Sequence, residues 1–155
     1  MIEESKILNF KNLLSFRSNL TQCELQNELK NIDKFLKENK LSITGPKIST
    51  TYSVKQSMDP VMDIEILIPI DNSFNETSKY KFKKELKLIN TLKNDYIGNP
   101  QGFNNCVMEI QEYISQNSLI PISSLYTVTI HEIQNQNDID NFHAELYIAI
   151  NPNIF

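Results

Sequence analysis

The strongest strand pattern in the chain is DIEILIPI, residues 63–70, whose side chains alternate between the two faces of an extended backbone. Its four isoleucines share one face and predict a buried core, whereas Glu65 lies on the opposite face. A similar segment, ELYIAI at residues 145–150, carries Glu145 at the matching place. Because the patterns that precede each segment also recur in the same order, we interpret the sequence as one supersecondary unit written twice.

The first copy is predicted to begin with a strand within residues 5–18. Thr21 and Glu24 then form a capping box at the start of a helix over residues 21–40, whose apolar residues recur at helical spacing. Gly45-Pro46 predicts the end of this segment, because glycine accepts the positive φ of a helix exit and proline prevents the helix from resuming. Residues 48–54 then predict a second strand before residues 63–70.

The second copy follows a polar connector at residues 71–78. A long strand is predicted over 80–95, with a bulge or bend because its apolar residues do not alternate strictly. A helix over 101–117 comes next, then strands over 126–132 and 144–150, separated by an exposed loop at residues 134–141.

The fold class predicted from these elements is α+β. Two β-α-β-β repeats, about residues 5–71 and 79–153, form a single domain with a shared antiparallel sheet and both helices on one of its faces. The other face of the sheet would then line a groove where the two repeats meet.

Composition limits the possible partners. The chain of 155 residues has a formal net charge of −4 and a single arginine, Arg17, which disfavours a nucleic acid as partner. No apolar stretch is long enough for a membrane helix and no signal peptide is evident, so we expect a cytoplasmic protein. Cys23 and Cys106 are interpreted as core residues of the two helices, with a reactive thiol as the less favoured alternative.

Several short motifs resemble the GyrI-like effector-binding domains, a family related in fold to the SOUL haem-binding proteins. The matching positions are Lys37–Leu41, Gly45-Pro46, Tyr52 and residues 63–70 in the first copy, and Tyr96-x-Gly98, Tyr126 and residues 145–150 in the second. The resemblance implies a stand-alone domain that binds a small amphipathic or cationic molecule between its repeats. It also implies a minority interpretation as a hydrolase.

The chain departs from the family pattern at two positions. Thr127 stands beside Tyr126 where members that bind cations usually carry a glutamate, and Pro100 replaces an aromatic residue after the Tyr-x-Gly turn. A buried carboxylate is the obvious counter-charge for a cation, so its loss at Thr127 weakens both the cation-binding and the hydrolase interpretation.

The candidate ligand- or partner-binding residues are Tyr52, Glu65, Tyr96, Tyr126 and Glu145. For the two glutamates the simpler interpretation is a solvated strand carboxylate, and the alternative is a pair facing the groove and able to hold an ammonium group. The tyrosines are interpreted either as packing residues with an edge hydroxyl or as lining of the groove.

No catalytic or metal motif is evident. His131 and His143 flank the exposed loop and could share a metal, but no third ligand is visible, so we expect structural or solvated histidines and no metal. Neither a nucleophile–base arrangement nor a glycine-rich phosphate loop is present, and we expect neither an enzyme nor a cofactor.

Two functions follow as hypotheses. The first is a non-enzymatic GyrI-like module that binds an amphipathic small molecule in the inter-repeat groove. The alternative is a protein-binding chaperone or adaptor for a segment of a secreted toxin. That alternative rests on similar proteins among the accessory proteins of type VII secretion in low-GC Gram-positive bacteria.

Overall fold

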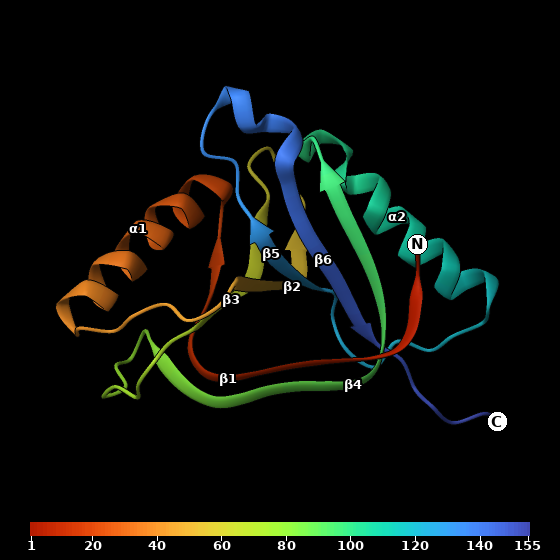
Figure 1. Ribbon diagram of the computed structural model, residues 1–155, viewed down its shortest axis with the longest axis horizontal. Coiled ribbons are helices and arrows are strands. Elements are labelled where there is room, and N and C mark those ends of the chain that lie inside the picture. Colours follow the sequence, from red (N-terminus) through yellow and green to blue (C-terminus); the bar gives the residue numbers. More distant parts are fainter. The chain divides into compact units, whose positions relative to one another are not determined.

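The computed structural model describes residues 1–155 and has an α+β fold (Figure 1). The elements run in the order β1 (Glu3–Leu20), α1 (Gln22–Glu38), β2 (Lys47–Lys55), β3 (Val61–Pro69), β4 (Lys81–Gly98), η1 (Pro100–Gly102), α2 (Phe103–Gln116), β5 (Tyr126–His131), η2 (Gln136–Asn141) and β6 (Phe142–Ala149). Apart from the two short 3₁₀ helices, this is β-α-β-β written twice, as the sequence predicts.

The chain divides into two compact units. We call Phe10–Leu86 the first-repeat unit, and Met1–Asn9 together with Lys87–Phe155 the second-repeat unit. The long strands β1 and β4 each contribute residues to both. The predicted repeat boundaries, the placement of both helices on one face and the groove between the repeats stay predictions.

In the first-repeat unit, β3 pairs antiparallel with β1 on one side and β2 on the other. The register runs from Leu13 opposite Pro69 to Leu20 opposite Met62 on the β1 side. On the β2 side the register shifts between Thr51 and Ser53, so that Tyr52 is the extra residue of a bulge. A bulge redirects the local side chains, and here it acts on one of the predicted site residues.

The second-repeat unit repeats this arrangement. Strand β6 lies between β4 and β5, with Thr91 opposite Ala149 and Tyr126 opposite Tyr147. The β5 register shifts between Thr129 and His131, in the strand that corresponds to β2. The two copies therefore share pairing partners, strand direction and the position of the bulge.

The duplication extends to single hydrogen bonds. Asn12 in β1 and Asn90 in β4 both have positive φ, 57° and 54°, which bends each long strand and confirms the irregularity predicted for β4. The carbonyl oxygen of Asn12 accepts from Ile70 N at 2.8 Å, and that of Asn90 accepts from Ile150 N at 3.1 Å. Equivalent backbone hydrogen bonds thus join the end of the last strand to the bent long strand in both copies.

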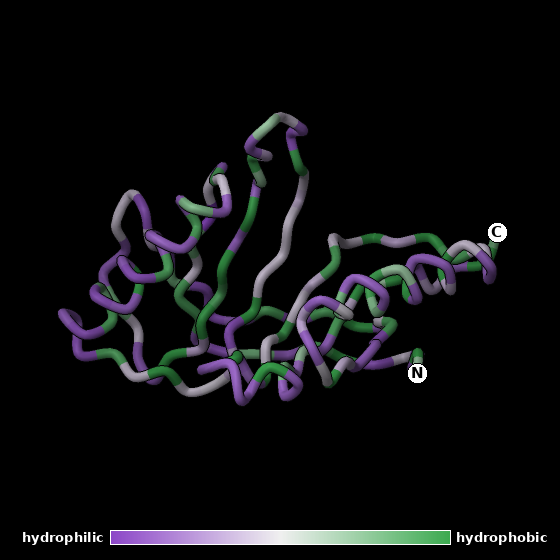
Figure 2. The backbone as a smooth tube through the Cα atoms, turned by 90° about the horizontal axis from the view of Figure 1, so that it is seen from above, coloured by the Kyte–Doolittle hydropathy of each residue, from purple (hydrophilic) through white to green (hydrophobic).

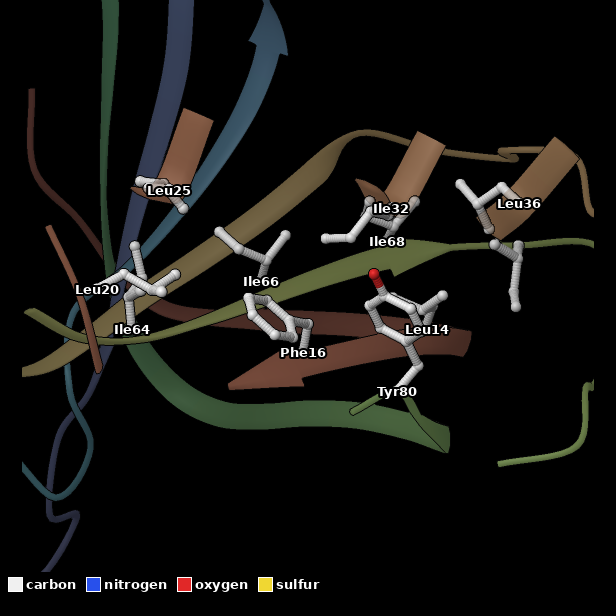
Figure 3. Close-up of a cluster of buried hydrophobic side chains, with 11 residues drawn as sticks. Leu14, Phe16, Leu20, Leu25, Ile32, Leu36, Ile64, Ile66, Ile68 and Tyr80 are labelled. Carbon is white, nitrogen blue, oxygen red and sulfur yellow. The ribbon is translucent and has the colours of Figure 1, made fainter. Parts of the chain in front are cut away.

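Helix α1 begins as predicted. Thr21 and Glu24 form a complete capping box, in which each side chain accepts a hydrogen bond from the backbone N–H of the other residue. Both α1 and α2 mix hydrophilic and hydrophobic residues along their length, as amphipathic helices do (Figure 2). Figure 3 shows Leu25, Ile32 and Leu36 of α1 above residues of β1 and β3, among them the predicted isoleucine face.

The predicted role of Gly45 in the helix exit is wrong. Helix α1 is capped at its C-terminus by Asn39, and Lys40 takes the positive φ of 55° that terminates it. Gly45 instead allows the Pro69 ring to pack closely against it, because a Cβ there would lie 3.2 Å from Cγ of Pro69. In the second copy Ser118 has the same role as Lys40, with φ of 52° after the Asn117 cap.

The cysteine prediction is right for one helix and wrong for the other. Cys106 of α2 is buried with Leu92, Ile110 and Leu146 in the core of the second-repeat unit. Cys23 is exposed, because it occupies the first turn of α1 on the side away from the buried face. Burial raises the pKa of the Cys106 thiol to about 11, so that thiol is unreactive at neutral pH.

No helix is both long and apolar enough to cross a membrane.

Candidate functional site

Glu65 is the central residue of the candidate site. Its side chain extends from β3 on the face opposite the isoleucines, yet the residue is only 3% exposed, so the interpretation as a solvated carboxylate is wrong. Its Oε2 accepts hydrogen bonds from the Ser15 hydroxyl at 2.5 Å and from the Lys83 ammonium at 2.6 Å. Its Oε1 accepts from the Tyr52 hydroxyl at 2.6 Å. The buried carboxylate is thus held by two neutral hydroxyl donors and one cation.

These donors keep Glu65 ionised. Burial alone would raise the pKa of its carboxyl, but the hydrogen bonds from Lys83, Ser15 and Tyr52, with the positive charge of Lys83, outweigh burial and lower that pKa. The Lys83 side chain is 44% exposed, in contrast to its partner. The charge that neutralises Glu65 can therefore leave for water, whereas the carboxylate cannot.

Tyr52 is positioned by a second ion pair. The guanidinium of Arg17 donates to both carboxylate oxygens of Asp63, at 3.0 Å and 2.9 Å. These hydrogen bonds raise the pKa of Arg17 and lower that of Asp63. The same guanidinium lies 3.8 Å from the centroid of the Tyr52 ring, a cation–π distance, and its charge also interacts with that of Glu65. One face of the ring is therefore covered by Arg17, and its hydroxyl is directed at Glu65.

Glu145 occupies the position in β6 that Glu65 has in β3, as the sequence predicts. It is half-buried and forms an ion pair with Lys93 at 2.8 Å, while the Tyr147 hydroxyl donates to it at 3.2 Å. The hydrogen bond to Glu145 raises the pKa of Lys93, and burial raises that of Tyr147. Directly opposite Glu145 in the strand register is Asp95, so two acidic residues form a cross-strand pair.

Tyr96 and Tyr126 are placed as packing residues of the second-repeat unit. The Tyr96 hydroxyl donates to the carbonyl oxygen of Asn99, and its ring packs against Phe103 and Phe142. A Cβ on Gly102 would lie 2.3 Å from that hydroxyl, so the ring fills a space that requires glycine. Tyr126 is buried opposite Tyr147.

The two histidines have separate acidic partners. The Nε2 atom of His131 lies 2.7 Å from Asp138, and that of His143 lies 2.8 Å from Asp95. Although His131 and His143 are register partners across β5 and β6, the structure gives them no common ligand set. A pair of histidines sharing one metal ion is therefore not the arrangement present.

Sequence reasoning missed Ser15, Arg17 and Lys83 as members of the Glu65 cluster. Ser15 and Arg17 lie opposite Leu67 and Glu65 in the β1–β3 register. A sequence analysis that assumed this antiparallel pairing would therefore have placed both residues beside Glu65. Lys83 lies in β4, beyond the connector, and no short-range pattern in the sequence distinguishes it from its neighbour Lys84.

A cavity of about 660 Å³ opens in the second-repeat unit. Leu92, Leu119 and Ile150 supply apolar lining, and Glu4 and Asn90 supply polar atoms. Its volume falls in the range of small-molecule sites. None of the five predicted site residues lines it, so the Glu65 cluster and this cavity are separate features.

No family model and no curated protein matches the sequence. Among solved structures, the chain is similar to the C-terminal domain of EcmrR, with 11% identity and a TM-score of 0.72 over 97% of this chain and 98% of that one. It is 14% identical to EcmrR in a DNA complex, with a TM-score of 0.73 over 96% of this chain, and it spans 57% of that chain's length.

The chain is also similar to a hydrolase from Listeria innocua, with 12% identity and a TM-score of 0.64 over 97% of this chain and 91% of that one. At these identities the likeness shows the fold. The chain has the GyrI-like, SOUL-like fold that the sequence motifs predict.

Proposed function

We propose that the protein is a non-enzymatic binding module for amphipathic small molecules that carry a primary ammonium group. The observation that carries this proposal is the buried, ionised carboxylate of Glu65, which receives its charge-assisted hydrogen bond from the partly exposed Lys83. An incoming ammonium group would take the place of the Lys83 ammonium and donate a hydrogen bond to the same oxygen of Glu65.

Of the two charges in the Glu65–Lys83 pair, the Lys83 ammonium is the replaceable one. Removing the counter-charge from a buried carboxylate is strongly unfavourable, so the site always requires a cation. The Lys83 side chain loses conformational freedom when its ammonium pairs with Glu65 and regains that freedom on release into water. A ligand ammonium that brings its own apolar group would compensate for displacing Lys83 by burying that group.

The apolar part of such a ligand has a surface to contact on β2. Tyr52 and Val54 are large apolar side chains that are 39% and 45% exposed, and the Tyr52 hydroxyl already binds Glu65. A polar anchor beside exposed aromatic and aliphatic groups is the usual composition of a small-molecule site.

The same geometry disfavours hydrolysis at Glu65. A general acid or base works best with a pKa near the operating pH, whereas the pKa of Glu65 is lowered and its oxygens are engaged by three donors. A nucleophile activated by an adjacent base is likewise missing from this cluster, since Ser15 donates to a carboxylate that cannot readily take its proton.

The test is calorimetric titration with 4-phenylbutylamine, which is charged at neutral pH, and with 4-phenylbutanol, its uncharged analogue. The amine should bind the wild type, and Lys83→Ala should bind it about tenfold more tightly, because a charge-assisted hydrogen bond no longer has to be displaced. Glu65→Gln should lose this preference for the amine over the alcohol.

The matched control is Lys84→Ala, which removes the neighbouring lysine of the same strand and should leave the affinity unchanged. Equal binding of amine and alcohol by the wild type would contradict the proposal. So would equal amine affinities of the wild type and Lys83→Ala.

The protein-binding alternative predicts a different result. A chaperone or adaptor for a secreted toxin segment would bind neither compound and would co-purify with one protein in stoichiometric amount from its native cell. Glu65→Gln would then leave that association intact.

A further inference from the structure

Three potential metal ligands from two adjacent strands meet in the second-repeat unit. They are Asp95 of β4 and His143 and Glu145 of β6, and one ligand atom from each lies within 4.8 Å of the other two. The His143 Nε2 is already 2.8 Å from Asp95 Oδ1. All three residues are at least partly exposed, so an ion in solution can reach them.

The Asp95–His143–Glu145 cluster lacks the guanidinium that the first-repeat unit has at the matching position. In the first-repeat unit the residue opposite the β3 glutamate is Arg17, whereas in the second it is Asp95, opposite Glu145. Like charges directly opposite each other in an antiparallel pair are destabilising. The first-repeat unit balances two carboxylates, Asp63 and Glu65, with a guanidinium and an ammonium, but Asp95 and Glu145 have only Lys93 and an imidazole.

We propose that Asp95, His143 and Glu145 bind a divalent transition-metal ion such as Zn²⁺. One imidazole nitrogen and two carboxylate oxygens form a three-residue donor set that leaves further coordination positions to water. The ion would supply the positive charge that the guanidinium of Arg17 supplies in the other repeat. The ligand atoms need only small side-chain rotations to reach coordination distance, because they are already gathered on neighbouring strands.

Lys93 is the residue that competes with the ion. Its ammonium lies 2.8 Å from Glu145 Oε2, and the Tyr147 hydroxyl donates to Oε1 of the same carboxylate. Metal binding therefore requires Lys93 to move away, so Lys93→Met should bind the metal more tightly than the wild type does.

The experiment uses untagged full-length protein with Cys23→Ser, which removes the exposed thiol as an unrelated ligand. Titration with Zn²⁺ by calorimetry should give one site, and Co²⁺ should bind at the same site with visible absorption bands. Asp95→Asn and His143→Gln should each weaken Zn²⁺ binding at least tenfold, in line with the loss of one ligand. The matched control is His131→Gln, at the register partner of His143. This variant should leave the affinity for Zn²⁺ unchanged.

Binding of Zn²⁺ to the folded protein should also raise the midpoint of thermal unfolding, and the two ligand variants should lose that increase. Circular dichroism of each variant without metal verifies that it is folded. The proposal is overturned by an absence of Zn²⁺ binding in both wild type and Lys93→Met. It is equally overturned by binding that His131→Gln removes and His143→Gln does not.

Discussion

The two repeats have the same backbone but different charge at matching positions. Each closing strand, β3 or β6, carries a glutamate, β1 and β4 each bend at an asparagine, and β2 and β5 each have a bulge. In the first-repeat unit the residue opposite the glutamate is Arg17, and in the second it is Asp95. The difference teaches that duplication preserves pairing and backbone geometry, while a change of residue type gives two equivalent positions opposite charges.

The largest contrast expected between the repeats is in thiol reactivity. Cys23 of α1 is exposed, whereas burial raises the pKa of Cys106 in α2 to about 11. A shift of about two units lowers the thiolate fraction by about 100-fold, and burial slows the reaction further. Native protein mixed with a chromogenic disulfide should therefore show one fast thiol, and urea-unfolded protein should show two. Two fast thiols in the native protein would mean that the second-repeat core is open.

Removing the two glutamates should have unequal effects on stability. Glu65→Ala leaves the buried hydroxyl of Ser15, the partly exposed hydroxyl of Tyr52 and the Lys83 ammonium without their acceptor, and should lower the free energy of unfolding by about 2–3 kcal/mol. Glu145→Ala breaks a partly exposed ion pair and should lower it by about 1 kcal/mol or less. Urea denaturation of both variants measures this directly, and equal losses would mean that Glu65 is not the buried member of the pair.

Lowering the pH should remove the stabilisation that the ionised Glu65 carboxylate contributes to the folded state. Its folded pKa lies below the ordinary value of 4.5, so the stability that it contributes is fully present above pH 4.5. That contribution is lost as the pH falls from there through the lower folded pKa. The difference in unfolding free energy between wild type and Glu65→Gln should therefore shrink between neutral pH and pH 3. A difference that grows on acidification would show that the folded pKa is raised instead.

The smallest predicted effect is the same in both repeats. Lys40 and Ser118 follow the two helices with positive φ, a conformation that costs side-chain-bearing residues about 1 kcal/mol or more and costs glycine little. Lys40→Gly and Ser118→Gly should each stabilise the protein by about 0.5–1 kcal/mol in thermal unfolding. If one variant stabilises and the other destabilises, the helix exits are not equivalent.

Periodic patterns made most of the fold predictable. The isoleucine face of β3, the Thr21–Glu24 capping box and the repeated order of elements depend on residues close together in sequence. The helix exit was mispredicted because Gly45 is the usual signal, whereas Lys40 adopts the same backbone conformation without being glycine. Cys23 is exposed because it lies on the face of α1 opposite the buried Leu25, Ile32 and Leu36.

The site was less predictable because its contacts join distant strands. The pattern identified Glu65 and Tyr52, and the structure joins them by a hydrogen bond. The burial of Glu65 depends on Ser15 and Lys83, which come from β1 and β4 and have no local signature. Tyr96 is a candidate through the resemblance of Tyr96-x-Gly98 to the GyrI-like motif, but its hydroxyl donates to the Asn99 carbonyl oxygen and fixes that turn.

The most direct test of the Glu65 site is the affinity of Lys83→Ala for 4-phenylbutylamine relative to wild type, measured by calorimetry at neutral pH. A replaceable lysine predicts an affinity about tenfold higher in the variant, with no such gain for 4-phenylbutanol. Identical amine affinities in the two proteins would show that the Lys83 ammonium does not occupy the position of a ligand.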